Sequence, residues 1–383
     1  MKILGVVTLV SPNGEYGGPL RVAVNQLREL SRRGHDVVLA GSARGYEGPP
    51  PSSIEGVRTR LFPARTALPG AGFAGLTSPG LLRSLYSHVR EFDVVHVHAA
   101  RDLVTLPAAR LAQRAGVRTV LQTHGMIDES SHPLAGPLDA VLTRPALRDA
   151  AAVTYLTPEE RRSLEVVGRG DAHLAHLING VPAADDGDED SAESRAGGGD
   201  DEVGGGEVLY LARLAPRKNP VMFAQVAAQL AAQFPHTRFR LVGPDEGMGA
   251  EVSRVAADAA LGDRLRWEGP LAPELTLDRM RAASVYVLPS VDEPYPMSVL
   301  EAMSVGLPVV VTTSCGLAGL VAEHRAGAVV EPEAGALRAA IADLLADPVA
   351  AARAGQRGRD AVARTRSMTS VAEKLEDLYS SAS

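Results

Sequence analysis

The sequence predicts an α/β protein in which two domains, each built on a parallel sheet, follow one another along the chain. In the first part of the chain, short apolar runs alternate with longer segments whose apolar residues recur at helical spacing, which is typical of βαβ units and a parallel sheet. The stretch 185–207 breaks this pattern, because it is rich in acidic residues and glycine and holds almost no apolar side chain. The same alternation restarts after it, which indicates two α/β domains in series.

The first domain is expected at residues 1–178. Continuous apolar, largely β-branched runs are typical of strands that are buried on both faces of a parallel sheet. Such runs occur at 2–10, 36–42, 92–100, 118–125 and 151–157. The clearest helices, at 18–35 and 105–116, carry apolar residues three and four positions apart and reach a glycine near their ends.

A linker is expected at 179–207, and its acidic, glycine-rich part is predicted to be flexible because it cannot bury enough apolar surface to offset the entropy of ordering. The second domain follows at 208–360. Its strands are predicted at 208–214, 238–245, 264–270, 283–290 and 308–313, with a helix at 219–234. The end of the chain, 361–383, is predicted to be a helix that packs back on the first domain.

Composition excludes several classes of protein. The chain has 383 residues and a formal net charge of −7, which argues against nucleic acid as a partner. The single cysteine, Cys315, excludes an internal disulfide and a cysteine-based zinc site, and it favours a reducing, cytoplasmic setting. No apolar run approaches the roughly 18 residues that a membrane span needs, whereas peripheral contact with a membrane surface stays open.

The segment DEPYPMSVLEAM, residues 292–303, carries the clearest chemical signal. Proline is tolerated in a first helical turn, so a helix is expected to begin near Pro296. The amides of Met297 and Ser298 would then form an anion site suited to phosphate. Glu293 precedes this helix and Glu301 lies inside it, and both carboxylates can accept hydrogen bonds from hydroxyl pairs.

These features resemble the retaining glycosyltransferases of family 4. The resemblance implies the GT-B fold, an α/β architecture in which two Rossmann-like domains face a central cleft. The segment EPYPMSVLEAMSVGLPVV is similar to their E-x7-E motif, and this is the specific part of the resemblance. Shorter pieces follow in the order of the family along nearly the whole chain: GGP, RRGHDVVL, DVVHVH, THG, LARLAPRKNP and LVGPDE.

The resemblance implies roles in the second domain. Glu293 would bind hydroxyls of the donor sugar, and Glu301 would bind the ribose of the nucleotide. Arg213 and Lys218 would hold the diphosphate and stabilise it as it leaves, which agrees with the chemistry because cleavage builds negative charge there. Gly243, at a strand end, would line the donor pocket. The Lys-Gly pair usual in the family is Lys218-Asn219 here, which leaves the local turn open.

In the first domain, Gly17 and Gly18 follow the first strand, and their amides would approach the diphosphate. His124 follows a strand end, where ligands bind in parallel sheets, and the resemblance places it against the donor sugar. His98 is a candidate for contact with the acceptor, as is Asp128, although a structural role for each is an alternative.

Together with these residues, the resemblance implies a retaining hexosyltransferase that moves a sugar from a nucleoside diphosphate, with uridine favoured, to a hydroxyl of a natural-product or polysaccharide acceptor. The nucleotide sugar would be a co-substrate, and no metal or other cofactor is expected because two cations can act on the diphosphate. The alternatives are a nucleotide-sugar 2-epimerase of the same architecture and a non-catalytic nucleotide-sugar binding subunit. The alanine-, arginine- and glycine-rich composition suggests a bacterial source.

Overall fold

The computed structural model describes residues 1–12, 17–182, 206–272 and 275–381. These residues form two compact units, one of Met1–Pro182 with Met368–Ser383 and one of Ala183–Ser367. The acidic segment predicted at 185–207 lies outside the described residues as far as residue 205. The end of the chain thus belongs to the unit that contains its beginning.

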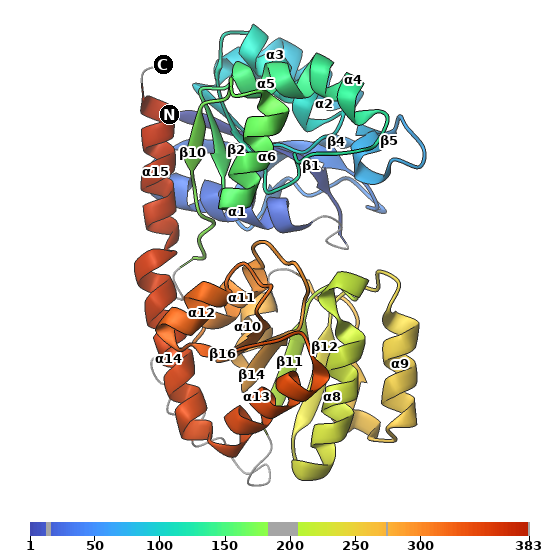
Figure 1. Cartoon of the computed structure of the whole chain (residues 1–383). Helices are drawn as coiled ribbons and strands as arrows, with labels where there is room; N and C mark the ends of the chain where they lie inside the picture. Colours follow the sequence, from blue (N-terminus) through green and yellow to red (C-terminus); the bar gives the residue numbers. More distant parts are fainter. Residues whose placement is uncertain (13–16, 183–205, 273–274, 382–383) are drawn as a thin grey trace. The chain divides into compact units, whose positions relative to one another are not determined.

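In the described part of the first unit, eight strands form one sheet in the order β10-β9-β8-β7-β1-β2-β4-β3. Figure 1 labels β10, β1, β2 and β4 of this sheet. The pairs are parallel except β3 with β4. The strands are β1 (Lys2–Val10), β2 (Asp36–Ala43), β3 (Ser53–Ile54), β4 (Val57–Pro63), β7 (Val94–His98), β8 (Arg118–Gln122), β9 (Ala152–Tyr155) and β10 (Leu174–His176), with a separate antiparallel pair of β5 (Arg65–Thr66) and β6 (Leu76–Thr77). Strands β2 to β4 lie on one side of β1 and β7 to β10 lie on the other, so the strand order reverses between β1 and β7.

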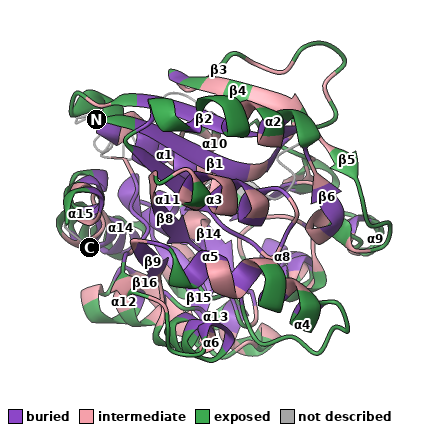
Figure 2. Cartoon of the chain, turned by 90° about the horizontal axis from the view of Figure 1, so that it is seen from above, coloured by how far each residue is buried: buried purple, intermediate pink, exposed green. Residues whose placement is uncertain are grey.

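Both faces of this sheet are covered. The helices are α1 (Gly17–Arg32), α2 (Pro79–His88), α3 (Thr105–Arg114), α4 (Ala135–Leu138), α5 (Arg144–Arg148), α6 (Pro158–Gly168) and α15 (Met368–Ser380), with the 3₁₀ helices η1 (Gly72–Gly75) and η2 (Val89–Glu91) and the π-helix η3 (Asp139–Thr143). Leu4 and Val6 of β1 pack in the cluster of α2, α3 and α5, whereas Ile3 and Val7 pack in the cluster of α1 and α15. Because successive side chains of a strand alternate in direction, burial on both faces explains the continuous apolar run. Figure 2 shows the buried strands and the exposed outer sides of the helices.

Helix α15 is tied to the first unit by charge as well as by apolar packing. Arg33 donates to Glu376 from Nη2 to Oε2 (2.8 Å) and His35 Nε2 lies 2.7 Å from the other carboxylate oxygen. The sequence predicts one helix over 361–383, but the structure has two. Helix α14 (Pro348–Thr365) belongs to the second unit, and α15 begins after a break at residues 366–367.

In the described part of the second unit, six parallel strands form a sheet in the order β13-β12-β11-β14-β15-β16. They are β11 (Glu207–Leu211), β12 (Arg238–Val242), β13 (Leu265–Trp267), β14 (Val285–Leu288), β15 (Val309–Thr312) and β16 (Gly327–Val330). The helices are α8 (Pro220–Gln233), α9 (Gly249–Asp258), α10 (Thr276–Arg281), α11 (Met297–Ser304), α12 (Ala318–His324), α13 (Ala334–Ala346) and α14, with turns η5 (Pro216–Lys218) and η6 (Gly262–Arg264). This is the strand order of a Rossmann fold, and ligands bind in such sheets where the order reverses, here between β11 and β14.

Across the described residues, no helix is long and apolar enough to cross a membrane.

Candidate functional site

The loops after β11 and β14 carry three of the predicted site residues of the second unit. Arg213 and Lys218 follow β11, and Glu293 follows β14. These strands are neighbours in the sheet although 75 residues separate Lys218 from Glu293 in the chain. The two loops therefore leave the sheet together at the point where its strand order reverses.

Lys218 and Glu293 form a buried ion pair. Lys218 Nζ donates to Glu293 Oε2 over 2.6 Å, and the two side chains are only 11% and 10% exposed. Burial lowers the pKa of Lys218, because removal from water disfavours its ammonium form, and the charge of Glu293 opposes that effect. Arg217 adds a second cation, with Nη2 lying 3.5 Å from the same carboxylate oxygen. The pair thus places a cation and a hydrogen-bond acceptor beside each other at the edge of the sheet where the strand order reverses.

Asn219 adopts the backbone conformation that the sequence alone did not decide. It has φ 52° and ψ 44°, in the left-handed region, between the turn η5 and helix α8. Glycine enters this region without steric cost, and asparagine is among the few other residues that do so readily. The Lys-Asn pair therefore makes a left-handed turn directly after Lys218.

The loop that carries Glu293 is held by its neighbours. Val291 N donates to the carbonyl of Arg217 (2.9 Å), and Gly316 N donates to the carbonyl of Glu293 (2.8 Å). A Cβ atom at Gly316 would lie 1.8 Å from the carbonyl oxygen of Pro294, so only glycine fits this approach. The position of the carboxylate is therefore set by backbone contacts on both sides of the loop.

Helix α11 begins at Met297 with Pro296 as its N-cap, as the sequence predicts. The amides of Met297 and Ser298 occupy its first two positions, where the dipole and free N–H groups favour an anion. The hydroxyl oxygens of Ser298 and Tyr286 lie 2.8 Å apart, which fixes the first turn against β14. Glu301 lies one turn further along and is 6% exposed. The helix thus combines a candidate phosphate site with a buried carboxylate.

Arg213 does not point freely into the site. Its Nη1 donates to both carboxylate oxygens of Glu246, at 2.6 and 2.8 Å, and both side chains are 39% exposed. The sequence motifs gave no sign of this partner, although Glu246 is the last residue of the segment LVGPDE, which begins in β12. A diphosphate bound by Arg213 would have to displace the Glu246 carboxylate or share the guanidinium with it.

Gly243 serves the packing of the loop after β12. Its φ is 144°, and a Cβ atom there would lie 2.1 Å from the carbonyl oxygen of Ala212. Trp267 Nε1 donates to the carbonyl of Gly243 (2.9 Å). Gly243 therefore brings the loops after β11 and β12 into close contact, beside the residues predicted to hold the diphosphate.

In the first unit, three imidazoles form a stack, which we call the histidine stack (His96, His98 and His124). The ring centroids of His96 and His98 are 4.7 Å apart and those of His98 and His124 are 5.1 Å apart. Nδ1 of His98 lies 2.8 Å from Nε2 of His124, and Nδ1 of His96 lies 2.7 Å from the hydroxyl of Tyr379 in α15. His98 was a candidate for acceptor contact, but it is 1% exposed, so it supports the ring of His124 instead.

The histidine stack is held neutral by burial. Removal from water lowers the pKa of His124 to about 3 and that of His96 to about 4. The pKa of His98 is also well below its usual value, first through burial and then through its two neighbours. A neutral imidazole has one N–H donor and one acceptor nitrogen, so His124 can donate or accept a hydrogen bond but does not supply a positive charge.

The remaining predicted residues of the first unit lie in loops or at a helix end. Asp128 is 65% exposed, and its carbonyl accepts from Arg101 Nη2 (2.7 Å). Gly17 is the first residue of α1. Gly18 is exposed and a Cβ atom there would meet no atom within 4 Å, so this position does not need glycine for space.

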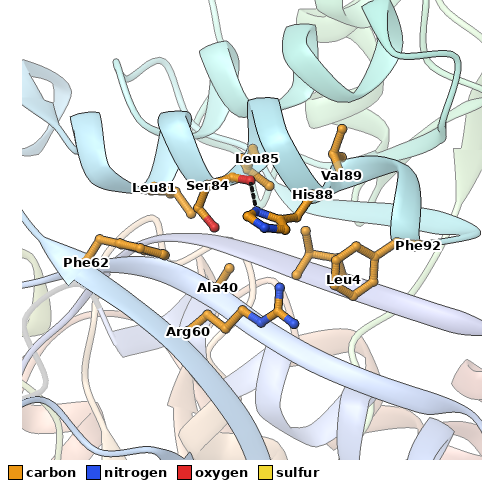
Figure 3. A pocket seen from close by; sticks show the side chains of 10 residues that line it. All are labelled: Leu4, Ala40, Arg60, Phe62, Leu81, Ser84, Leu85, His88, Val89 and Phe92. Atoms are coloured by element: carbon orange, nitrogen blue, oxygen red, sulfur yellow. Dashed lines mark hydrogen bonds between the residues drawn. The ribbon is translucent and has the colours of Figure 1, made fainter.

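A separate pocket of the first unit contains none of the predicted site residues (Figure 3). It is a narrow slot between α2 and the strands β1, β2 and β4, walled by Leu81, Leu85 and Phe92 among others. Arg60 stacks over Phe92, with the guanidinium carbon 5.7 Å from the ring centroid. The apolar slot lies on the face of the sheet, away from the strand ends that carry the candidate site.

Comparisons with known proteins match both units. Residues 17–180 match the family described as "Glycosyl transferase 4-like domain", and residues 202–361 match "Glycosyl transferases group 1". The D-inositol 3-phosphate glycosyltransferase of Geodermatophilus obscurus is 29% identical over 86% of this chain and 78% of its own length. The GDP-mannose-dependent alpha-(1-6)-phosphatidylinositol monomannoside mannosyltransferase of Mycolicibacterium smegmatis is 30% identical over 70% of this chain and 71% of its own length.

Solved structures agree on the fold. HepE of Anabaena, solved in complex with UDP and glucose, superposes with a TM-score of 0.74 and 18% identity over 100% of both chains. WaaG, a glycosyltransferase involved in lipopolysaccharide biosynthesis, superposes with a TM-score of 0.69 and 16% identity over 99% of this chain and 100% of its own. The two Rossmann-like parts are those of the GT-B fold, as the sequence predicts.

Proposed function

Because the chain belongs to the family 4 glycosyltransferases, we propose that it is a retaining enzyme that moves a hexose-type sugar from a nucleoside diphosphate to a hydroxyl group. Uridine is the base we favour, and the second unit would bind the donor. The observation that carries this proposal is the buried Lys218–Glu293 pair beside the start of α11, with Glu301 one turn further on.

The donor half of the proposal follows from the chemistry of these groups. A nucleotide sugar presents hydroxyls on both sides of a diphosphate, and carboxylates accept from hydroxyls whereas cations and helix N-termini bind phosphate. Glu293 would take the sugar hydroxyls and Glu301 the ribose hydroxyls. Lys218 and the amides of Met297 and Ser298 would take the diphosphate.

The mechanism needs stabilisation of the leaving group. Cleavage of the anomeric bond places negative charge on the diphosphate, and a buried ammonium aimed at it lowers the barrier more than an exposed one would. Lys218 would provide this ammonium, and Arg213 would join it once Glu246 is displaced. The acceptor would enter on the face from which the diphosphate leaves, so that the anomeric configuration is kept, and a diphosphate oxygen would take its proton.

His124 would contribute a hydrogen bond rather than a charge. Its pKa is lowered to about 3, so it is neutral at physiological pH. A neutral imidazole can donate to or accept from a sugar hydroxyl without repelling the positive charge that develops on the sugar ring. Because two cations would act on the diphosphate, we also propose that transfer needs no metal ion.

The acceptor is proposed from the relatives. The names of two of them contain D-inositol 3-phosphate and phosphatidylinositol monomannoside, and both of these molecules carry polyhydroxylated rings. We therefore place the acceptor hydroxyl on a cyclitol or sugar ring, free or within a natural product or polysaccharide.

The test is transfer itself. UDP-glucose and GDP-mannose are incubated with myo-inositol, D-inositol 3-phosphate and simple sugars, with and without EDTA, and products are identified by proton NMR. The proposal predicts a product with the anomeric configuration of the donor in at least one pairing, at equal rates with EDTA. An inverted product contradicts retention, and isomerisation of the donor without an acceptor would identify a 2-epimerase. Tight nucleotide binding without turnover would indicate a binding subunit.

A further inference from the structure

Glu160 departs from the role that its sequence position predicts. Thr157 is the N-cap of α6, and its side chain accepts from Glu160 N over 3.1 Å. Glu160 is the third residue of the helix, and a glutamate there usually completes a capping box by accepting from the amide of the N-cap residue. Here the carboxylate reaches the turn after β8 instead.

The carboxylate of Glu160 binds donors on both sides of His124. Oε1 accepts from Thr123 Oγ1 (2.6 Å) and from Gly125 N (2.5 Å), and Oε2 accepts from Leu156 N (2.7 Å). Glu160 is 6% exposed, so these contacts lie in the interior of the first unit. Hydrogen bonds to a carboxylate are shorter and stronger than neutral ones, and buried groups depend on them more.

The turn that the carboxylate holds is unusual. His124 has φ 52° and Gly125 has φ 71°, so two successive residues are left-handed, and the first of them is not glycine. A non-glycine residue stays in this region only where its surroundings impose it. The contacts of Glu160 to Thr123 and Gly125 bracket the strained residue directly.

We propose that Glu160 is a positioning residue, whose carboxylate holds the left-handed turn that presents His124 to the donor sugar. This inference rests on the proposed function for the reaction, but the contact between Glu160 and Gly125 can be tested without it. Glu160 acts through the turn and touches no reacting atom. Its neighbour Glu159 lies in the same first turn of α6 and is exposed, which makes it a matched control.

The first measurement is spectroscopic. In protein labelled with ¹⁵N-glycine, the amide proton of Gly125 is expected far downfield, because it donates to a carboxylate at 2.5 Å. Glu160→Gln should move this signal upfield, since one amide oxygen cannot replace two carboxylate oxygens that face only donors. Glu159→Gln should leave it unchanged. A Gly125 signal that does not move in Glu160→Gln overturns the proposal.

The second measurement is a kinetic cycle with His124→Ala, using whichever of UDP-glucose or GDP-mannose is turned over. Glu160→Gln alone should lower kcat by about tenfold or more with the donor KM within about twofold, and it should cost nothing further in the His124→Ala background. Equal losses in both backgrounds would show that Glu160 acts independently of His124 and would overturn the proposal.

The proposal remains testable if Glu160→Gln does not fold or if no nucleotide sugar is turned over. If Glu160→Gln does not fold, Thr123→Val removes one of the bracketing hydrogen bonds and is put through the same cycle, with the same result required. If no nucleotide sugar is turned over, the proposed function fails, and the Gly125 signal alone decides whether Glu160 holds the turn.

Discussion

Replacing Lys218 with methionine should destabilise the second unit as well as impair catalysis. The substitution keeps most of the apolar stem and removes the ammonium that lies 2.6 Å from Glu293. Both side chains are about one-tenth exposed, so the carboxylate would be left in a poorly hydrated place without its main partner. Such a loss costs more than the ion pair contributes, because the remaining charge keeps its desolvation penalty.

The expected magnitude follows from this geometry. Breaking a buried ion pair by removing one partner typically costs about 3–5 kcal/mol. Arg217 has its guanidinium 3.5 Å from the same carboxylate oxygen and is half exposed, so it offsets part of the loss. We therefore expect about 3 kcal/mol for Lys218→Met, and less for the double variant with Glu293→Gln, in which no unpaired charge remains.

The assay is urea unfolding of the wild type, both single variants and the double variant. The cycle should give a coupling free energy of about 1.5 kcal/mol or more. The control is the exposed pair Arg254–Asp258 on α9, at 3.0 Å, for which a coupling of about 0.5 kcal/mol or less is expected. Equal coupling in the two pairs would refute the argument that burial makes the Lys218–Glu293 interaction strong.

Three further predictions concern the same architecture. Burial lowers the pKa values of the histidine stack, so below about pH 6.5 the unfolded chain binds more protons than the folded one, and the stability that is complete above that pH falls towards pH 4. The urea midpoint of wild type should therefore fall more steeply with acid than that of His98→Gln. Equal slopes would contradict burial as the cause. Gly316→Ala should weaken nucleotide binding, measured by calorimetry, because its Cβ would collide with the carbonyl of Pro294. The control Gly335→Ala should bind as wild type does, because its Cβ would meet no atom within 4 Å. Similar affinities of the two variants would refute the close approach of Gly316 to Pro294. Glu376→Gln should speed proteolysis of α15 at neutral pH, because hydrogen bonds from Arg33 hold the pKa of the Glu376 carboxyl at about 2 and the group is charged there. The difference from wild type should vanish as the pH falls to that value. An unchanged digestion rate at pH 7 would rule out a contribution of Glu376 to the attachment of α15.

Much of the fold follows from sequence patterns. The continuous run 2–10 is a strand because its alternate residues fill the two clusters on either side of the sheet, and no polar face interrupts it. The proximity of Lys218 and Glu293 agrees with the sequence pattern, since each follows a recognisable strand and parallel strands end at one edge of the sheet. The helix start at Met297 followed from the tolerance of proline in a first turn.

Tertiary partners were not predictable in the same way. His98 ends β7 and His124 follows β8, so both lie at strand ends. Which of the two rings is buried under the other depends on a contact between residues 26 positions apart in the chain. The bond between Arg213 and Glu246 likewise joins two loops of the sheet. The sequence TPEE at 157–160 predicts a helix start, but it carries no sign that Glu160 reaches the turn of His124. The break between α14 and α15 also has no strong breaker, since neither glycine nor proline occurs at residues 366–367.

Binding of a sugar nucleotide by the second unit is tested most directly by a thermal-shift panel of uridine, guanosine and adenosine diphosphates and their sugars. It compares wild type, Glu301→Ala and a control, Glu323→Ala, in which an exposed glutamate of α12 is removed. At about 100 times the dissociation constant a ligand should stabilise the protein by about 2.7 kcal/mol. We expect nucleotides of one base family to raise the melting temperature of wild type and of Glu323→Ala alike, and we expect this shift to collapse in Glu301→Ala. A full shift in Glu301→Ala, or none in wild type with any nucleotide, would contradict the assignment of this unit to the sugar nucleotide.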